Sequence, residues 1–260
     1  MRKAVLILFA LLFNIGLQAQ DKVYLAIDFM NVSEGQSNAY WETETFWSKI
    51  HQERVKSGEI LGWDLWSLLP GGEKQQFQYA TVQQYNDLAK MMAGMPDLMS
   101  TVKKAYPNMS EADIRAKLNA TSASRSIGAR AFLEIINSTK DDFKMKKGMV
   151  TTFDMMKVDM ESYAAYEKAE NDLFKPDHQK GVDSGAKGSW SLARMMLPFG
   201  SDTYASHITF NFYTDWKQFT APGNTRAAVS PDMEKKINEA LKLRDMKYVF
   251  LGQLEMMVRP

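Results

Sequence analysis

The sequence predicts an α+β protein in which one β-α-β-β-α-β unit occurs twice along the chain. The octet His51–Gly58 returns 127 residues later as His178–Gly185, and a tryptophan follows each glycine after five residues, at Trp63 and Trp190. Over the thirteen positions that start at each histidine, six residues are identical. The same order of strand-like and helix-like segments surrounds both octets. Together these observations indicate an internal duplication.

Each unit opens with a run of apolar and β-branched residues that predicts a strand, at 23–32 and at 149–158. A helix rich in aromatic residues is expected next, and the octet ends it, because glycine is a common stop at a helix C-terminus. Pro176, two residues before His178, predicts a kink or a restart in the second copy of this helix. In the first copy, helical spacing places five residues on one face: Tyr40, Glu44, Trp47, His51 and Val55.

A hairpin follows in both units, since proline and glycine separate two apolar runs. The expected strands are 62–69 and 77–83 around Pro70-Gly71-Gly72, and 189–197 and 204–212 around Pro198-Phe199-Gly200. A second helix comes next in each unit. Ser110 and Asp113 resemble a capping box in the first unit, and Ser230 before Pro231 is typical of a helix start in the second. The closing strands are expected at 131–136 and 249–254.

This order is that of the ferredoxin-like unit, a four-stranded antiparallel sheet with both helices on one face. The open face of such a sheet must be covered, and two copies in one chain can cover each other. We therefore expect two tandem ferredoxin-like units that form an intrachain pseudo-dimeric α/β barrel. The expected boundaries are a signal peptide over 1–20, the first unit over 21–147 and the second over 148–260.

With its repeated His-Gln-x-x-Val-x-Ser-Gly-x4-Trp pattern, this arrangement resembles the dimeric α/β-barrel superfamily. That group holds NIPSNAP-type proteins and antibiotic-biosynthesis-type monooxygenases, and the chain is most similar to its exported bacterial members. As topology, the resemblance covers nearly all of the mature chain. The superfamily includes enzymes, haem proteins and proteins without a known role, so the resemblance implies a fold and no single activity.

The first twenty residues have the organisation of a secretory signal peptide. Arg2 and Lys3 precede the apolar run 4–13, and Ala19 is a small residue at a plausible cleavage point. We therefore expect export, to the periplasm or to the extracellular space. No later apolar run is long enough for a membrane span.

Composition excludes several classes of partner and site. The absence of cysteine excludes disulfides, thiolate metal sites and a lipid-attachment cysteine. Without the two basic residues of the leader, the chain has 30 basic and 31 acidic residues, which argues against a nucleic-acid partner. Three scattered histidines do not suggest a zinc site, so no metal is expected. The sequence allows a homo-oligomer without specifying one.

The repeated residues are the candidate ligand-binding residues. His51 and His178 either pack on the sheet or face a pocket as acid, base or ligand contact. Trp63 and Trp190 either fill the core or form the aromatic wall of a cavity. Trp66 lies three positions after Trp63, so it is expected on the opposite face of its strand.

Two further polar residues fall within predicted strands of the second unit. Arg194 lies in an apolar strand, where it either binds an anionic group or is paired or partly exposed. His207 has no histidine counterpart in the first unit; it lies near Tyr204 in a predicted strand, where it either lines a pocket or, as the simpler expectation, has a core or surface position.

These features favour an exported protein that binds a small, partly apolar molecule in a barrel or cleft pocket. An enzyme is the first alternative, either a cofactor-independent monooxygenase-like protein or a haem-dependent one with a histidine axial ligand. A structural or assembly protein without a ligand is the second alternative. No cofactor is expected, and haem is kept open only by the resemblance. The phosphate-binding glycine loop, the nucleophile elbow and the HExxH motif are absent from the sequence.

Overall fold

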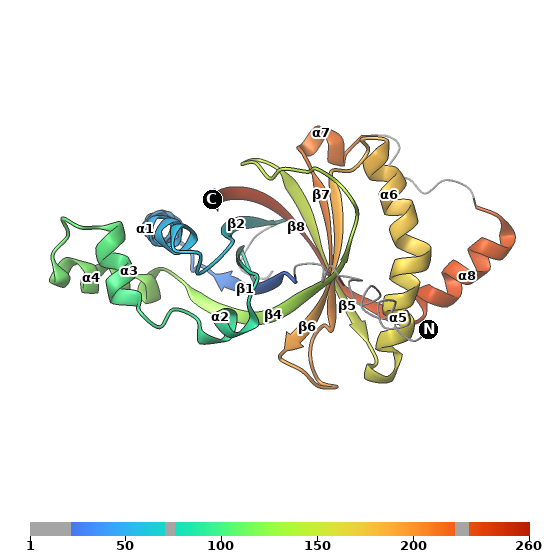
Figure 1. The fold of residues 1–260 in the computed structure, drawn as a ribbon, viewed down its shortest axis with the longest axis horizontal. Coiled ribbons are helices and arrows are strands. Elements are labelled where there is room, and N and C mark those ends of the chain that lie inside the picture. Colours follow the sequence, from blue (N-terminus) through green and yellow to red (C-terminus); the bar gives the residue numbers. More distant parts are fainter. Residues whose placement is uncertain (1–21, 71–75, 222–228) are drawn as a thin grey trace, which may run out of the picture.

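A computed structural model describes residues 22–70, 76–221 and 229–260. Its eight strands form a closed barrel in the order β1-β3-β2-β8-β5-β7-β6-β4 (Figure 1). The first four are β1 (Tyr24–Asn31), β2 (Gly62–Leu69), β3 (Tyr79–Tyr85) and β4 (Ser126–Ser138). The others are β5 (Val150–Val158), β6 (Ser189–Leu197), β7 (His207–Tyr213) and β8 (Arg244–Val258). The expected signal peptide and the turn residues Gly71 and Gly72 lie outside the described residues.

The two halves of the barrel repeat one strand order, β4-β1-β3-β2 and β8-β5-β7-β6. Antiparallel pairs β2–β8 and β4–β6 join the halves, so each strand of the closed barrel has two neighbours. Closure leaves no unpaired edge among the described strands, and it also buries the sheet faces that would be open in a single unit. The predicted pseudo-dimeric α/β barrel is therefore confirmed. The connection from β4 to β5 contains the expected division of the chain at residue 147, which stays a prediction.

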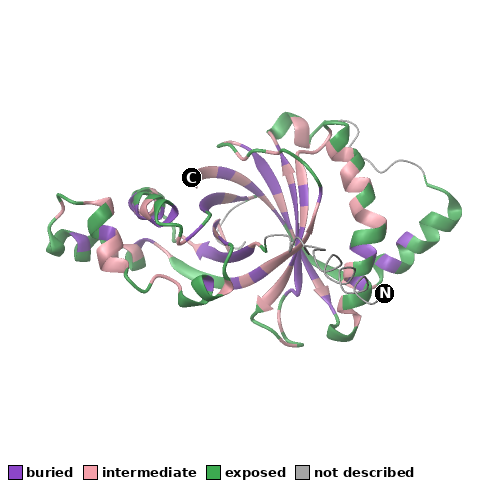
Figure 2. Cartoon of the chain, in the orientation of Figure 1, coloured by how far each residue is buried: buried purple, intermediate pink, exposed green. Residues whose placement is uncertain are grey.

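The helices cover opposite sides of the barrel (Figure 1). On one side lie those of the first half, α1 (Ser37–Lys56), α2 (Leu88–Ala93), α3 (Leu98–Ala105) and α4 (Glu111–Ser124). On the other side lie α5 (Tyr163–Ala169), α6 (Lys175–Asp183), α7 (Trp216–Phe219) and α8 (Pro231–Leu241). Buried residues concentrate along the strands (Figure 2). The largest buried cluster includes Trp66 and Phe153 and is separate from the clusters beneath the helices. None of the described helices is long and apolar enough to cross a membrane.

The helical segment of the first half corrects one expectation. Three helices follow β3, where the sequence suggested a single one. Gly94, at a φ of 67°, ends α2, and Pro107 follows Tyr106, the C-cap residue of α3. The expected cap at Ser110 is confirmed, since its Oγ accepts a hydrogen bond from the Asp113 N–H.

Two details of the second half also differ from expectation. Strand β8 is far longer than the predicted 249–254, because its exposed first residues also pair with β5. The sequence did not predict this extension, since these residues show no apolar alternation. The chain remains helical through Pro176, and a π-helical turn, Glu170–Phe174, joins α5 to α6. Pro176 lies in the first turn of α6, where its missing N–H has the smallest effect. The helix is therefore irregular near Pro176, as predicted, but the irregularity is a π-helical turn before the proline and not a restart of the helix.

Candidate functional site

The repeated octet forms the same helix end in both halves. Gly58 and Gly185 adopt φ values of 69° and 76°, a conformation that glycine adopts without strain. Each glycine N–H donates to the carbonyl of the repeated valine three residues earlier. The repeated serines donate from Oγ to a helix carbonyl, Ser57 to Arg54 at 2.9 Å and Ser184 to Gly181 at 3.1 Å. Valine, serine and glycine recur because they end this helix.

The repeated histidine and tryptophan form a stacked pair beneath each helix. The ring centroids of His51 and Trp63 are 4.9 Å apart at an interplanar angle of 16°. Those of His178 and Trp190 are 4.8 Å apart at the same angle. Each pair joins the end of a helix to the second strand of its half. The match in geometry is what the duplication predicts.

A cation bonds to each of these histidines and fixes its tautomer. Arg54 Nη1 lies 3.2 Å from His51 Nδ1, and Lys187 Nζ lies 2.8 Å from His178 Nδ1. Arginine and charged lysine only donate, so each Nδ1 accepts and the ring proton is on Nε2. Burial lowers the pKa of His51 well below its usual value and that of His178 to about 3, which keeps both rings neutral.

The same cations bond to equivalent amides on the third strand of each half. Arg54 Nη1 donates to Gln83 Oε1 at 2.5 Å, and Lys187 Nζ donates to Asn211 Oδ1 at 2.6 Å. Gln83 pairs with Trp63 across the sheet, as Asn211 pairs with Trp190. The cations come from different sequence positions, so the octet alignment does not reveal them.

A cavity of about 410 Å³ lies beside the first octet, between α1, α2 and the outer face of β1, β3 and β4. This volume suits a small molecule. Of the sequence candidates, His51 and Trp63 line it. The other lining residues include aromatic rings and five charged side chains: Trp47, Tyr85, Phe132, Asp28, Glu44, Arg54, Arg125 and Arg130. The structure therefore supplies a polar pocket with an aromatic wall.

Buried charges line the deep part of this cavity. The Glu44 side chain is 1% exposed, and its Oε1 lies 3.3 Å from Arg125 Nε. Burial raises the pKa of Glu44 to about 7, against the lowering effect of Arg125. The Tyr40 hydroxyl also interacts with the Glu44 carboxyl, so these three side chains form one largely buried polar cluster.

Sequence reasoning missed that this polar cluster is duplicated as well. Tyr166, Glu170 and Arg244 form its counterpart in the second half, where the Tyr166 hydroxyl and the Arg244 guanidinium interact with the Glu170 carboxyl. Burial raises the pKa of Glu170 too. The signal was available, because Tyr-x-x-x-Glu recurs 126 residues apart, the same offset as that of the two opening strands.

Replacing Glu44 with glutamine is expected to change how stability depends on pH. The carboxyl has a pKa of about 7 in the folded chain against a usual 4.5, so the folded state keeps a proton that the unfolded chain loses. The protonated Glu44 carboxyl therefore contributes its full stability below the pKa that it has in the unfolded chain. This contribution is lost as the pH rises through the pKa that Glu44 has in the folded chain. Relative to wild type, Glu44→Gln should gain about 2–3 kcal/mol between about pH 4 and pH 8.

Chemical denaturation across that pH range measures the difference. Glu111→Gln is the control, because Glu111 is exposed and its pKa is lowered by Arg115 and Lys103, opposite in direction to that of Glu44. Parallel stability curves for wild type and Glu44→Gln would show that Glu44 titrates normally.

The remaining sequence candidates lie away from this cavity. Trp66 points into the barrel, edge-on to Phe153 at 6.0 Å, so the predicted opposition to Trp63 is seen. His178 and Trp190 belong to the second half. Arg194 is 40% exposed and lies 3.4 Å from Glu167, which fits the paired alternative.

His207 forms a chain that resembles a catalytic serine, histidine and acid. Its Nδ1 lies 3.0 Å from Ser206 Oγ, and its Nε2 lies 3.1 Å from Glu167 Oε1. Ser206 is buried, however, and its Oγ also bonds to the backbone of Met156 and Val158. A substrate has no access to this hydroxyl, so the chain is a structural contact within the core.

The geometry of the histidines does not fit a haem axial ligand. Such a ligand needs a free nitrogen lone pair, usually with the other ring nitrogen donating to an acceptor. The structure describes all three histidines; His51 and His178 accept at Nδ1 from cations, and both nitrogens of His207 are bonded. Within the described residues, no group of three or more acidic or histidine side chains could hold a metal ion.

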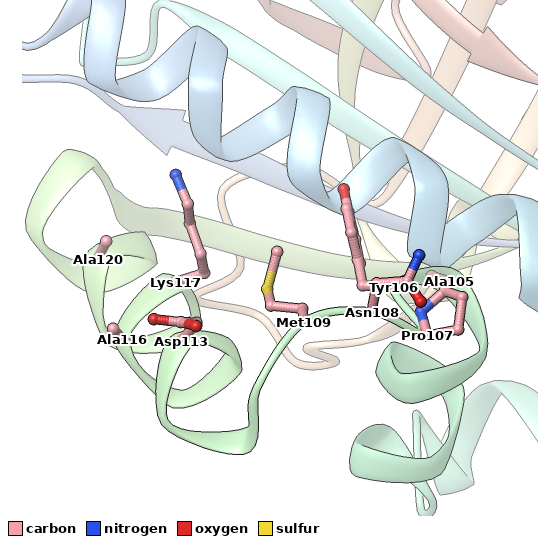
Figure 3. Close-up of a pocket in the computed structure, with 9 residues that line it drawn as sticks. All are labelled: Ala105, Tyr106, Pro107, Asn108, Met109, Asp113, Ala116, Lys117 and Ala120. Atoms are coloured by element: carbon pink, nitrogen blue, oxygen red, sulfur yellow. The ribbon is translucent and has the colours of Figure 1, made fainter.

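A larger depression, of about 790 Å³, lies between α3 and α4. Figure 3 shows Tyr106 and Lys117 extending from this region toward α1. The Tyr106 hydroxyl donates to the Phe46 carbonyl on α1 at 3.0 Å, so it supports helix packing. The depression is open and holds none of the sequence candidates.

Comparisons with solved structures identify the fold as that of dimeric α/β barrels. A proposed monooxygenase from Lactobacillus acidophilus NCFM is 9% identical, with a TM-score of 0.56 over 92% of this chain and 97% of that one. One from Fusobacterium nucleatum is 12% identical, with a TM-score of 0.54 over 92% and 94%. An anthrone oxidase-like protein is 7% identical, with a TM-score of 0.54 over 92% and 94%. No family model and no curated protein matches the chain.

Proposed function

We propose that the protein binds a small planar molecule with an anionic group in the cavity beside α1. The observation that carries the proposal is the position of His51. Its Nδ1 is occupied by Arg54, and its ring lines the cavity with the proton on Nε2, which has no described protein partner. The stacked Trp63 also lines this cavity, so a hydrogen-bond donor and an aromatic surface occur together.

The charge of the lining favours an anion. Arg54, Arg125 and Arg130 face two carboxyl groups, Asp28 and Glu44. Arg130 donates from Nη2 to Asp28 Oδ2 at 2.7 Å, and burial raises the pKa of the Glu44 carboxyl to about 7, which reduces its negative charge near neutral pH. Arg54 pairs with Glu59 at 2.7 Å. Arg125 is therefore the guanidinium whose charge is least compensated, and it is suited to an anionic ligand group.

The two histidines supply a matched test of this proposal. Calorimetric titration with benzoate, salicylate and larger aromatic carboxylates should show saturable binding that the neutral methyl esters lack. His51→Phe keeps an aromatic ring but removes the donor, so it should weaken binding at least about tenfold. His178→Phe makes the same change outside the cavity and should leave the affinity unchanged.

Both variants should lose stability to a similar extent, because each ring stacks on a tryptophan. Equal affinities for His51→Phe and His178→Phe would contradict the proposed site. Complete absence of binding across the carboxylate set would favour the structural alternative, in which the octet only secures the helix to the sheet.

An oxygenase that needs no cofactor is a second candidate, supported by Glu44. A carboxylate with a pKa of about 7 beside the aromatic wall can accept a proton from an acidic C–H or O–H group of a bound phenolic substrate. Reaction of that anion with dioxygen would consume oxygen, which an electrode measures. Glu44→Gln should abolish the uptake while retaining binding, and unchanged uptake would eliminate this role for Glu44.

We also propose that the protein is exported, on the evidence of its first twenty residues. N-terminal sequencing of the protein from the culture medium or the periplasm should begin near Gln20 or Asp21. A protein retained inside the cell with Met1 intact would contradict export.

A further inference from the structure

A second cavity, of about 250 Å³, opens at the end of the barrel beside the hairpin between β6 and β7. Its lining is almost entirely apolar and comes from both halves of the chain: Phe29, Phe77, Met155, Met195, Tyr204 and Phe250. It lies on the inner side of the strands, whereas the cavity beside α1 lies on the outer side. Arg130 is the residue that contributes to both linings.

The cavity arises from a difference between the duplicated halves. On β8, Tyr248 and Phe250 pair with Met155 and Phe153 of β5. The equivalent register on β4 places Ala129 opposite Phe29 and Ala131 opposite Ile27 of β1. Both alanines line the cavity. The rings of Tyr248 and Phe250 in the second half thus correspond to two methyl groups, those of Ala129 and Ala131, in the first, and the smaller side chains leave space beside Phe250.

A continuous series of aromatic rings leads from the surface into this space. Tyr204 stacks on Tyr248 with ring centroids 5.3 Å apart, and Tyr248 lies parallel to Phe250 at 5.8 Å. Phe250 in turn contacts Phe29 at 6.2 Å. Tyr248 is 49% exposed, whereas Phe250 is 4% exposed. Large apolar side chains exposed at the mouth of an apolar cavity are typical of a binding site.

We propose that this barrel-end cavity binds a neutral, single-ring aromatic molecule. A dry apolar cavity of roughly 150 Å³ in another protein holds benzene, so a space of this size accepts one ring with a short substituent. The scarcity of polar lining groups selects against a charged ligand, because an ion would lose its hydration without compensation. The site is separate from the one beside α1 in position and in ligand charge.

Methionine methyl groups report on the two cavities separately. Met155 and Met195 line the barrel-end cavity, while Met91, Met92 and Met95 line the one beside α1. In protein carrying ¹³C-labelled methionine methyl groups, titration with p-cresol should shift the resonances of Met155 and Met195 and leave the other three in place. Single Met→Leu variants assign the resonances.

Ala131→Phe restores the ring that the other half carries at the equivalent position and should fill the cavity. We expect p-cresol to bind this variant at least about tenfold more weakly. His51→Phe should retain the p-cresol shifts, so failure of the other site would not affect this result. An absence of p-cresol shifts in the wild-type protein at Met155 and Met195 overturns the proposal. So do shifts confined to Met91, Met92 and Met95, and that readout does not depend on whether Ala131→Phe folds.

Discussion

Arg54→Met is expected to lower the free energy of unfolding by about 3–5 kcal/mol. The Arg54 side chain is 1% exposed, and it donates from Nε to Glu59 at 2.7 Å and from Nη2 to the Tyr85 hydroxyl at 3.1 Å. Its Nη1 also bonds to His51 and Gln83. Methionine fills most of the volume but bonds to none of these groups. The buried acceptors would then lose their partner, which is the larger part of the penalty.

Urea or guanidinium denaturation at neutral pH measures this difference. Arg194→Met is the matched control, because Arg194 is 40% exposed and has a single acidic partner, Glu167. An exposed pair of this kind contributes less than about 1 kcal/mol. Similar losses in the two variants would mean that the bonds of Arg54 are replaced by water in solution.

Trp190→Ala is expected to lower the free energy of unfolding by a comparable amount, about 3–5 kcal/mol. Trp190 is fully buried beneath the helices of the second half, packed with Tyr166 and Leu192 and stacked on His178. Alanine would leave a cavity where α5 and α6 pack on β5 and β6. The surroundings can collapse little, because these helices and strands hold the space open.

Thermal and chemical unfolding of this variant should be compared with those of Trp216→Ala. Trp216 is 36% exposed in the short helix α7 and bonds to Gln253 at its rim, so its loss should change stability little. A double-mutant cycle with His178→Ala isolates the stacking energy of the pair, expected near 0.5–1.5 kcal/mol. A loss below about 1 kcal/mol for Trp190→Ala would show that the octet does not hold helix and sheet together.

Comparison of the two halves distinguishes the residues that maintain the fold from those that line the proposed ligand sites. Both halves keep the stacked histidine and tryptophan, the helix end and the buried Tyr–Glu–Arg cluster. They differ in how a cation reaches the histidine, since Arg54 comes from the helix and Lys187 from the segment after it. They differ also inside the barrel, where two alanines of β4 hold the positions that aromatic residues hold on β8. Both proposed ligand sites occur where the halves have diverged.

The order of the strands and the fold class could be predicted from the sequence alone. The repeated octet, the alternation of apolar residues and the glycine and proline positions are local signals, and each acts within a few residues of itself. They therefore predicted β2 and β6 with the bounds that the structure has, as well as the caps at Ser110 and Ser230. Closure of the barrel followed from the same pattern, because two equal half-open sheets in one chain can bury each other.

Which of the repeated residues face a cavity could not be predicted, because it depends on three-dimensional packing. His51 and His178 are equivalent in sequence and in stacking, yet only His51 was found lining the cavity beside α1. The lining of that cavity includes Arg130, Phe132 and Met91, which are far from His51 in the chain and approach it through β4 and α2. Such contacts leave no local pattern, because the energy that places these side chains comes from long-range strand pairing and packing.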